Sequence, residues 1–218
     1  MIMKENFEIR AAAREKLQGN WKNPVLLTLL YFVCAGAVSG ISSLLGNQGV
    51  KGTFDTLLNI FVLAPIGFGY CLYFLHFIRN ETDENFATHL MAGFQNYGRT
   101  LGVVLLTAIY TFLWFLLFII PGIIKAYSYA MTYYIALDNP DFSAEACINR
   151  SMDMMSGHKF DLFLLDLSFI GWGLLCILTL GIGFLWLVPY IYTSRAEFYM
   201  ELKALEEGSF DDAEVAGL

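Results

Sequence analysis

The sequence predicts an all-helical protein that crosses a membrane several times, and three observations lead to this fold class. Of the 218 residues, 57% are apolar and 15% are charged, whereas soluble domains carry about 25% charged residues. A soluble chain of this length has too small an interior to bury so much apolar surface. Uncharged runs of about 20 residues also match the length that a helix needs to cross the hydrocarbon core. Composition therefore excludes a disordered chain, a collagen-like fibre, a disulfide scaffold and an ordinary soluble enzyme.

Six apolar segments predict six membrane spans. The first three are free of charged residues and have the length of a complete crossing. The fourth is shorter and contains Lys125, and the last two contain Asp161, Asp166, Arg195 and Glu197. The predicted spans cover residues 24–45, 56–78, 100–120, 122–137, 160–178 and 182–200.

Short turns are expected to join the later spans. Pro121 and Gly122 suit the second and third positions of a type II turn, which gives two antiparallel helices and six spans. The alternative is one kinked helix over 100–137 and five spans. Gly181 and Gly183 are the expected turn residues between the last two spans.

The distribution of basic residues supports six spans. With the amino terminus in the cytoplasm, six crossings leave Lys51 as the one basic residue in an outer loop, and place Lys125 and Arg195 within spans. The remaining basic residues fall on the inner side, as the positive-inside rule requires. Five spans would move Arg150 and Lys159 outside. We therefore expect both termini in the cytoplasm.

Three amphipathic stretches precede three of the spans and predict helices on the cytoplasmic side of the membrane. Their apolar residues recur at helical spacing within residues 9–21, 86–94 and 144–155. Each is followed by an outward span and by a return span that contains a proline and then several aromatic residues. This order suggests a weak threefold repeat, although amphipathic inner segments are also common in membrane proteins that have no repeat.

The end of the chain differs from the rest in charge. The net charge is −7, and five acidic residues lie in the last thirteen positions. We expect a single helical membrane domain over 1–205 and a flexible acidic tail over 206–218. No basic face is present that would predict a nucleic-acid partner. The five acidic residues are Glu206, Glu207, Asp211, Asp212 and Glu214.

Ionisable residues within the predicted spans form the candidate functional site, because burying a charge in a bilayer is costly. They are Lys125, Asp166, Arg195 and Glu197. Asp166 and Arg195 fall at the same expected depth on neighbouring antiparallel spans, so we expect them to pair. The pair is either a structural bridge that locks the two spans or a contact for a substrate or ion.

Signatures of catalysis and of metal or cofactor binding are missing from the sequence. The four cysteines are scattered without a C-x-x-C motif, and the three histidines lack the spacing of metal ligands. No phosphate-binding glycine loop, H-E-x-x-H or G-x-S-x-G motif is present. We therefore expect no catalytic residue, no metal and no cofactor.

Several motifs, most of them in the second half of the chain, resemble a known family. The chain is similar to the bacterial integral-membrane family known as domain of unknown function 975, and more distantly to the membrane domain beside some glycerophosphodiester phosphodiesterases. The resemblance implies a helical protein of the bacterial cytoplasmic membrane, without an established activity or catalytic residues. The motifs are Ile120–Tyr129, Asp138–Pro140, Ser151–Lys159, Ser168–Trp172, Leu178–Gly183 and Trp186–Tyr190.

Three functional hypotheses follow from these patterns. The first is a non-catalytic accessory protein that contacts membrane lipids, further copies of itself or another membrane protein. The second is a small transporter or channel that uses the intramembrane charges. The third is a membrane enzyme that acts on lipid headgroups.

Overall fold

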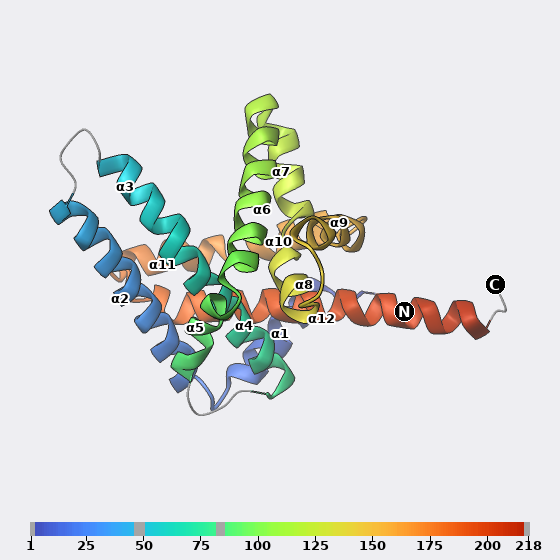
Figure 1. Cartoon of the computed structure of the whole chain (residues 1–218). Helices are drawn as coiled ribbons and strands as arrows, with labels where there is room; N and C mark the ends of the chain where they lie inside the picture. The colour runs from blue at the N-terminus through green and yellow to red at the C-terminus, as the bar shows by residue number, and fades with distance from the viewer. Residues whose placement is uncertain (1–2, 46–50, 82–85, 216–218) are drawn as a thin grey trace.

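The computed structural model describes residues 3–45, 51–81 and 86–215, and the regular structure within these ranges is helical (Figure 1). The elements in chain order are α1 (Asn6–Leu17), α2 (Lys22–Leu45), α3 (Lys51–Leu58), the π-helix η1 (Asn59–Leu63), α4 (Ala64–Arg79), α5 (Phe86–Gln95), α6 (Tyr97–Leu117), α7 (Ile119–Ser128), α8 (Thr132–Asp138), α9 (Ala144–Met154), α10 (Lys159–Leu167), α11 (Ile170–Leu178) and α12 (Phe184–Val215).

Four helical stretches of the described chain are long and apolar enough to cross a membrane. They are Lys22–Ser43, Asp55–Arg79, Tyr97–Leu117 and Lys159–Leu178, and they coincide with the predicted first, second, third and fifth spans. The predicted count of six is not confirmed, because the segments 122–137 and 182–200 are not among these helices.

The segment 122–137 is broken into two short helices. Helix α7 ends at Ser128 and α8 begins at Thr132, so neither has the roughly 20 residues that a crossing requires. The side chain of Ser151, on α9, forms hydrogen bonds with the backbone between α7 and α8. Its hydroxyl donates to the Ser128 carbonyl at 2.8 Å and accepts the Met131 N–H at 3.2 Å. A residue outside the segment therefore stabilises the interruption of its helix.

The segment 182–200 belongs to the long helix α12, which has 32 residues and contains Pro189. Helix α12 runs crosswise to α6 and α7 in Figure 1, and it packs against α1, α2 and α4. It reaches Val215, so residues 206–215 of the predicted tail are helical, whereas 216–218 lie outside the described residues.

Helices α6 and α7 form an antiparallel hairpin, which excludes a single kinked helix over 100–137 (Figure 1). The chain reverses at Phe118, which is extended with φ −158° and ψ 146°, and not at the predicted Pro121–Gly122 turn. Pro121 lies in the first turn of α7, where its missing N–H costs little. A Cβ on Gly122 would lie 2.6 Å from the Phe115 ring, so glycine permits the close packing of the hairpin.

The turn between α11 and α12 contains both glycines that the sequence placed there. Leu180 and Gly181 adopt positive φ values of 54° and 86°, a conformation that glycine reaches without strain. A Cβ on Gly183 would lie 2.7 Å from the sulfur of Cys176. The turn therefore needs glycine at 181 for its conformation and at 183 for the close approach to α11.

Some of the apolar residues in the predicted amphipathic stretches are buried inside the protein. On α1, Ile9, Ala13 and Leu17 are buried, and Leu90 on α5 and Ile148 on α9 are buried as well. The apolar face of α1 packs mainly on α12. These contacts account for the stripes without lipid, and a position of the three helices at the membrane interface stays a prediction.

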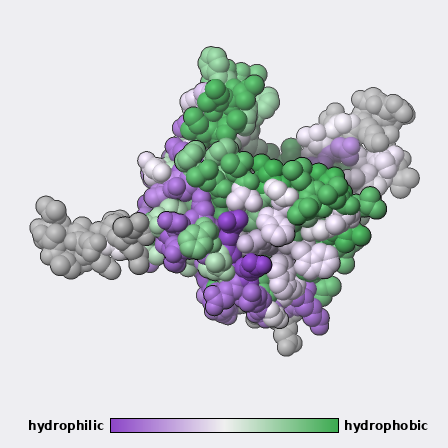
Figure 2. Space-filling view, turned by 180° about the vertical axis from the view of Figure 1, so that it is seen from behind, coloured by the Kyte–Doolittle hydropathy of each residue, from purple (hydrophilic) through white to green (hydrophobic). Residues whose placement is uncertain are grey.

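Apolar and polar surfaces lie on different sides of the molecule. The apolar surface covers the projecting part of the molecule and a band below it, and the hydrophilic surface lies mainly beneath (Figure 2). Large apolar side chains at the tip of the α6–α7 hairpin and along α10 and α11 are exposed, with Phe118 70% and Leu178 80% accessible. Exposed apolar patches of this extent are typical of membrane contact.

Candidate functional site

A cavity of about 790 Å³ brings together the irregular parts of the fold. Residues from α2, η1, α4, α6, α7, α8, α10 and α12 line it, together with the segment between α7 and α8. Its wall is rich in aromatic side chains that also carry a hydroxyl group. Six tyrosines contribute: Tyr31, Tyr127, Tyr129, Tyr133, Tyr134 and Tyr192. We refer to this space as the tyrosine cavity.

The Asp166–Arg195 ion pair lines the same cavity. Arg195 donates from Nε to Asp166 Oδ1 at 3.1 Å and from Nη2 to Asp166 Oδ2 at 2.8 Å. This bidentate geometry fixes the guanidinium plane. The Tyr127 hydroxyl donates to the same carboxylate at 3.3 Å. The structure thus contains the pairing that the equal depths of the two residues predicted.

The ion pair is only partly enclosed. The side chain of Arg195 is 39% exposed and that of Asp166 is 20% exposed. In the described part of the chain, Nη1 of Arg195 makes no hydrogen bond. The pair therefore links α10 to α12 and still offers a cationic donor to a molecule in the cavity.

Two irregular backbone segments border the tyrosine cavity. One is the break between α7 and α8, which contributes Tyr129 and Ala130, and the other is η1, which contributes Asn59 and Leu63. Irregular backbone at membrane depth occurs where it is buried in protein or faces a cavity. Single-turn π-helices are frequent at functional sites. For these two reasons we take this cavity as the candidate functional site.

The other two residues of the predicted polar site lie elsewhere. Lys125 places its ammonium group over the Trp114 ring, 5.0 Å from the centroid, and near the Met152 sulfur at 3.6 Å. Glu197 lines a separate cavity of about 690 Å³ together with Lys16. The four predicted residues therefore occupy three places, and they form no continuous polar path.

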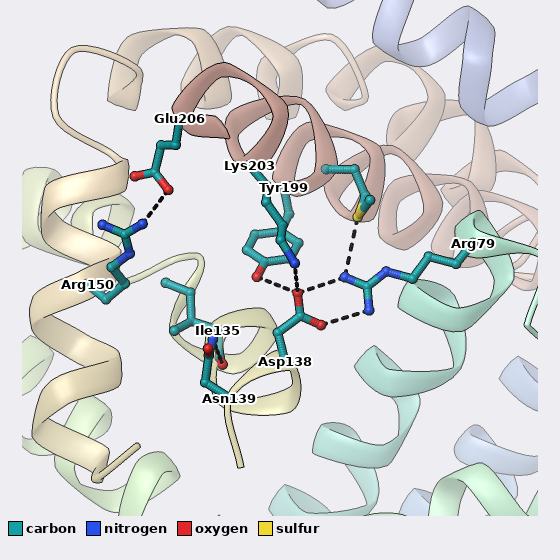
Figure 3. A network of polar contacts seen from close by, with 9 residues as sticks. Arg79, Ile135, Asp138, Asn139, Arg150, Tyr199, Lys203 and Glu206 are labelled. Atoms are coloured by element: carbon teal, nitrogen blue, oxygen red, sulfur yellow. Dashed lines mark hydrogen bonds and ion pairs between the residues drawn. The ribbon is translucent and has the colours of Figure 1, made fainter. Parts of the chain in front are cut away.

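Sequence reasoning missed a partly buried polar network around Asp138 (Figure 3). The Asp138 carboxylate accepts hydrogen bonds from Arg79 at 2.8 and 2.7 Å, from Tyr199 at 2.9 Å and from Lys203 at 3.0 Å. Burial raises the pKa of Asp138, but the hydrogen bonds from Arg79, Lys203 and Tyr199 outweigh burial and lower it. The network joins the ends of α4 and α8 to α12.

Sequence signals for these residues were weak. Tyr31 lies in the first predicted span, and the other five tyrosines follow Pro121 or Pro189 in the predicted return spans. Core packing and a cavity wall give this same sequence pattern, so it did not identify the cavity. Asp138 is the first residue of an Asp-Asn-Pro sequence, which indicates a helix end and not an ion pair.

The described residues contain no candidate metal site and no disulfide bond. Among these residues, no group of three His, Cys, Asp or Glu side chains is arranged to hold a metal ion. The four cysteines are free thiols, and three of them are buried.

Comparison with known proteins gives one match. A model of the family described as "Protein of unknown function (DUF975)" matches residues 1–129 and 115–206. Neither the curated proteins nor the solved structures contain a match. The distant similarity to the membrane domain of glycerophosphodiester phosphodiesterases thus stays a prediction.

Proposed function

The chain belongs to the DUF975 family of unknown function, and we propose that it is a non-catalytic membrane protein that binds an amphiphilic molecule of the lipid class in the tyrosine cavity. The observation that carries the proposal is the partly exposed Asp166–Arg195 pair in a wall of aromatic rings. A volume of about 790 Å³ is within the usual range for small-molecule sites.

The cavity wall matches the two halves of an amphiphile. Tyrosine rings offer apolar faces to an alkyl chain, and their hydroxyls offer hydrogen bonds at defined points. Nη1 of Arg195 is available for a phosphate, carboxylate or hydroxyl oxygen of a headgroup. The exposed apolar surface of α6, α7 and α10 supports a lipid as the ligand, because these three helices also line the cavity.

A cavity-filling substitution tests this proposal. Gly67 lines the cavity, and a Cβ at this position has the Tyr31 hydroxyl at 3.9 Å as its nearest neighbour. We expect Gly67→Leu to fold and to occupy space that the ligand needs. Native mass spectrometry of detergent-purified protein should then detect a retained lipid on the wild type and much less on the variant.

A second glycine provides the matched control. Gly36 on α2 has nothing within 4 Å of a built Cβ and does not line the cavity. Gly36→Leu makes the same change in a helix and should retain lipid at the wild-type level. Equal lipid retention by Gly67→Leu, Gly36→Leu and the wild type would overturn the proposal.

A small transporter is the second candidate, and the broken α7–α8 segment beside an ion pair supports it. Discontinuous helices form the substrate sites of several transporter folds. Flux of a defined solute into liposomes that depends on Asp166 and Arg195 would favour this function. The exchanged variant Asp166→Arg with Arg195→Asp separates the two roles, because restored activity identifies a structural bridge.

A further inference from the structure

A second large groove lies between α1 and the α11–α12 hairpin. Its volume is about 910 Å³, and it shares no lining residue with the tyrosine cavity. One wall is formed by α1 and the other by α11, the Thr179–Gly183 turn and the start of α12. We refer to it as the α1 groove. It is partly open to the surface, and most of its lining surface is apolar.

Two arginines give the α1 groove a positive wall. Arg10 and Arg14 lie one helical turn apart on α1 and both line the groove, beside one acidic residue, Glu15. In the described residues neither arginine forms an ion pair. Nε of Arg10 is buried and has no hydrogen-bond partner. The groove therefore contains cationic donors that the protein itself does not satisfy.

Tryptophans form much of the apolar part of the α1 groove. Three of the four tryptophans of the chain, Trp21, Trp172 and Trp186, line it. Trp172 is 54% and Trp186 is 47% exposed, and the neighbouring Leu175 is 53% exposed. Tryptophan is enriched where a protein meets the headgroup layer of a membrane. An apolar wall thus continues directly from the two arginines.

We propose that the α1 groove binds an anionic phospholipid. Arg10 and Arg14 contact the headgroup phosphate, and the acyl chains lie along Trp172, Leu175 and Trp186. The positive wall complements the charge of the headgroup, and the exposed aromatic and aliphatic wall complements the chains. A free phosphate ion would use only the first of these two features. The site is independent of the ligand in the tyrosine cavity.

Tryptophan fluorescence measures binding at this site, because the reporters line the groove. The full chain is reconstituted into phosphatidylcholine vesicles that contain brominated phosphatidylglycerol or brominated phosphatidylcholine at the same mole fraction. We expect stronger quenching by the anionic lipid. Each of the substitutions Arg10→Gln and Arg14→Gln should weaken its relative affinity about fivefold. Arg10→Lys and Arg14→Lys should keep most of the preference.

Three controls make the result specific for the α1 groove. Lys22→Gln removes one charge from a residue that lines a different cavity and should leave the preference unchanged. Trp172→Phe with Trp186→Phe should reduce the excess quenching by the anionic lipid and leave only the part that Trp21 reports. Added inorganic phosphate should not reduce it. Equal quenching by both lipids, an unchanged preference in the folded Arg10→Gln/Arg14→Gln variant, or displacement by phosphate would overturn the proposal.

Discussion

Asp138 on α8 joins two other helices through its side chain. Its carboxylate is 7% exposed and accepts hydrogen bonds from Arg79 on α4 and from Tyr199 and Lys203 on α12. A buried charge is tolerated when partners compensate it. Asp138 therefore connects three helices whose sequences lie far apart, and its loss leaves two positive charges without their common partner.

We predict that Asp138→Asn lowers the free energy of unfolding by about 2–3 kcal/mol. Breaking a buried ion pair costs about 3–5 kcal/mol, and the partial exposure of Arg79 and Lys203 reduces this value. Thermal or denaturant unfolding in detergent measures the change. Glu206→Gln is the control, because its pair with Arg150 is more exposed and should contribute at most about 1 kcal/mol. A similar effect of both substitutions would contradict this account.

The same carboxylate predicts a pH dependence of stability. Hydrogen bonds from Arg79, Lys203 and Tyr199 outweigh burial and lower the pKa of Asp138 in the folded protein. In acid, the unfolded chain therefore binds more protons than the folded protein does, and acid favours unfolding. The contribution of Asp138 is fully present above the ordinary carboxyl pKa of about 4 and is lost as the pH falls through the lowered pKa. Unfolding measured against pH should show this loss in the wild type and a smaller loss in Asp138→Asn.

Sequence reasoning succeeded for one ion pair and failed for the other for a physical reason. Asp166 and Arg195 stand out because they interrupt apolar segments, and a short turn places those segments side by side. Asp138 lies at a helix end, and an acidic residue at such a position does not by itself indicate an ion pair. Its partners are 59 to 65 positions away and come from two helices whose packing no local pattern reveals.

Among the helices, the break between α7 and α8 contributes part of the wall of the tyrosine cavity. No glycine or proline occurs from Ser128 to Met131, so the sequence of the segment itself does not predict an interruption. The buried Ser151 hydroxyl replaces helical hydrogen bonds at this point. Tyr129 and Ala130 are thereby placed in the cavity wall.

We predict that Ser151→Ala lowers the free energy of unfolding by about 1–3 kcal/mol. The substitution leaves the Met131 N–H and the Ser128 carbonyl without this partner in a buried place, which has a cost of this size. Ser43→Ala removes an exposed hydroxyl that bonds only the Gly40 carbonyl and should change stability by less than about 0.5 kcal/mol. Equal stability of the two variants would show that the Ser151 hydroxyl does not stabilise the backbone between α7 and α8.

Hydropathy predicted the helices that are specified by their own local sequence. Four predicted spans coincide with apolar helical stretches of sufficient length, of which the last consists of α10 and α11. The segment 122–137 was extended too far because its break depends on α9. The segment 182–200 was cut out of a longer helix, since α12 continues without interruption past Arg195 into charged sequence. Element type was thus predictable, but the boundaries that depend on tertiary contacts were not.

Across the whole molecule, the apolar and polar surfaces are separated in a way that suits a membrane. Exposed apolar side chains gather on the α6–α7 hairpin and on α10–α11, while most of the hydrophilic surface lies beneath the apolar surface in Figure 2. The tyrosine cavity combines contributions from both halves of the chain. This arrangement explains why a membrane-derived amphiphile is the class of ligand that we propose.

A crystal structure of the full chain grown in a lipidic phase shows whether the tyrosine cavity binds an amphiphile. We expect elongated density in the tyrosine cavity, with its polar end within hydrogen-bond distance of Nη1 of Arg195 and its apolar part against the tyrosine rings. The wild type and Gly36→Leu should both contain it, and Gly67→Leu should not. A cavity that holds only water beside an intact Asp166–Arg195 pair in all three proteins would contradict the account.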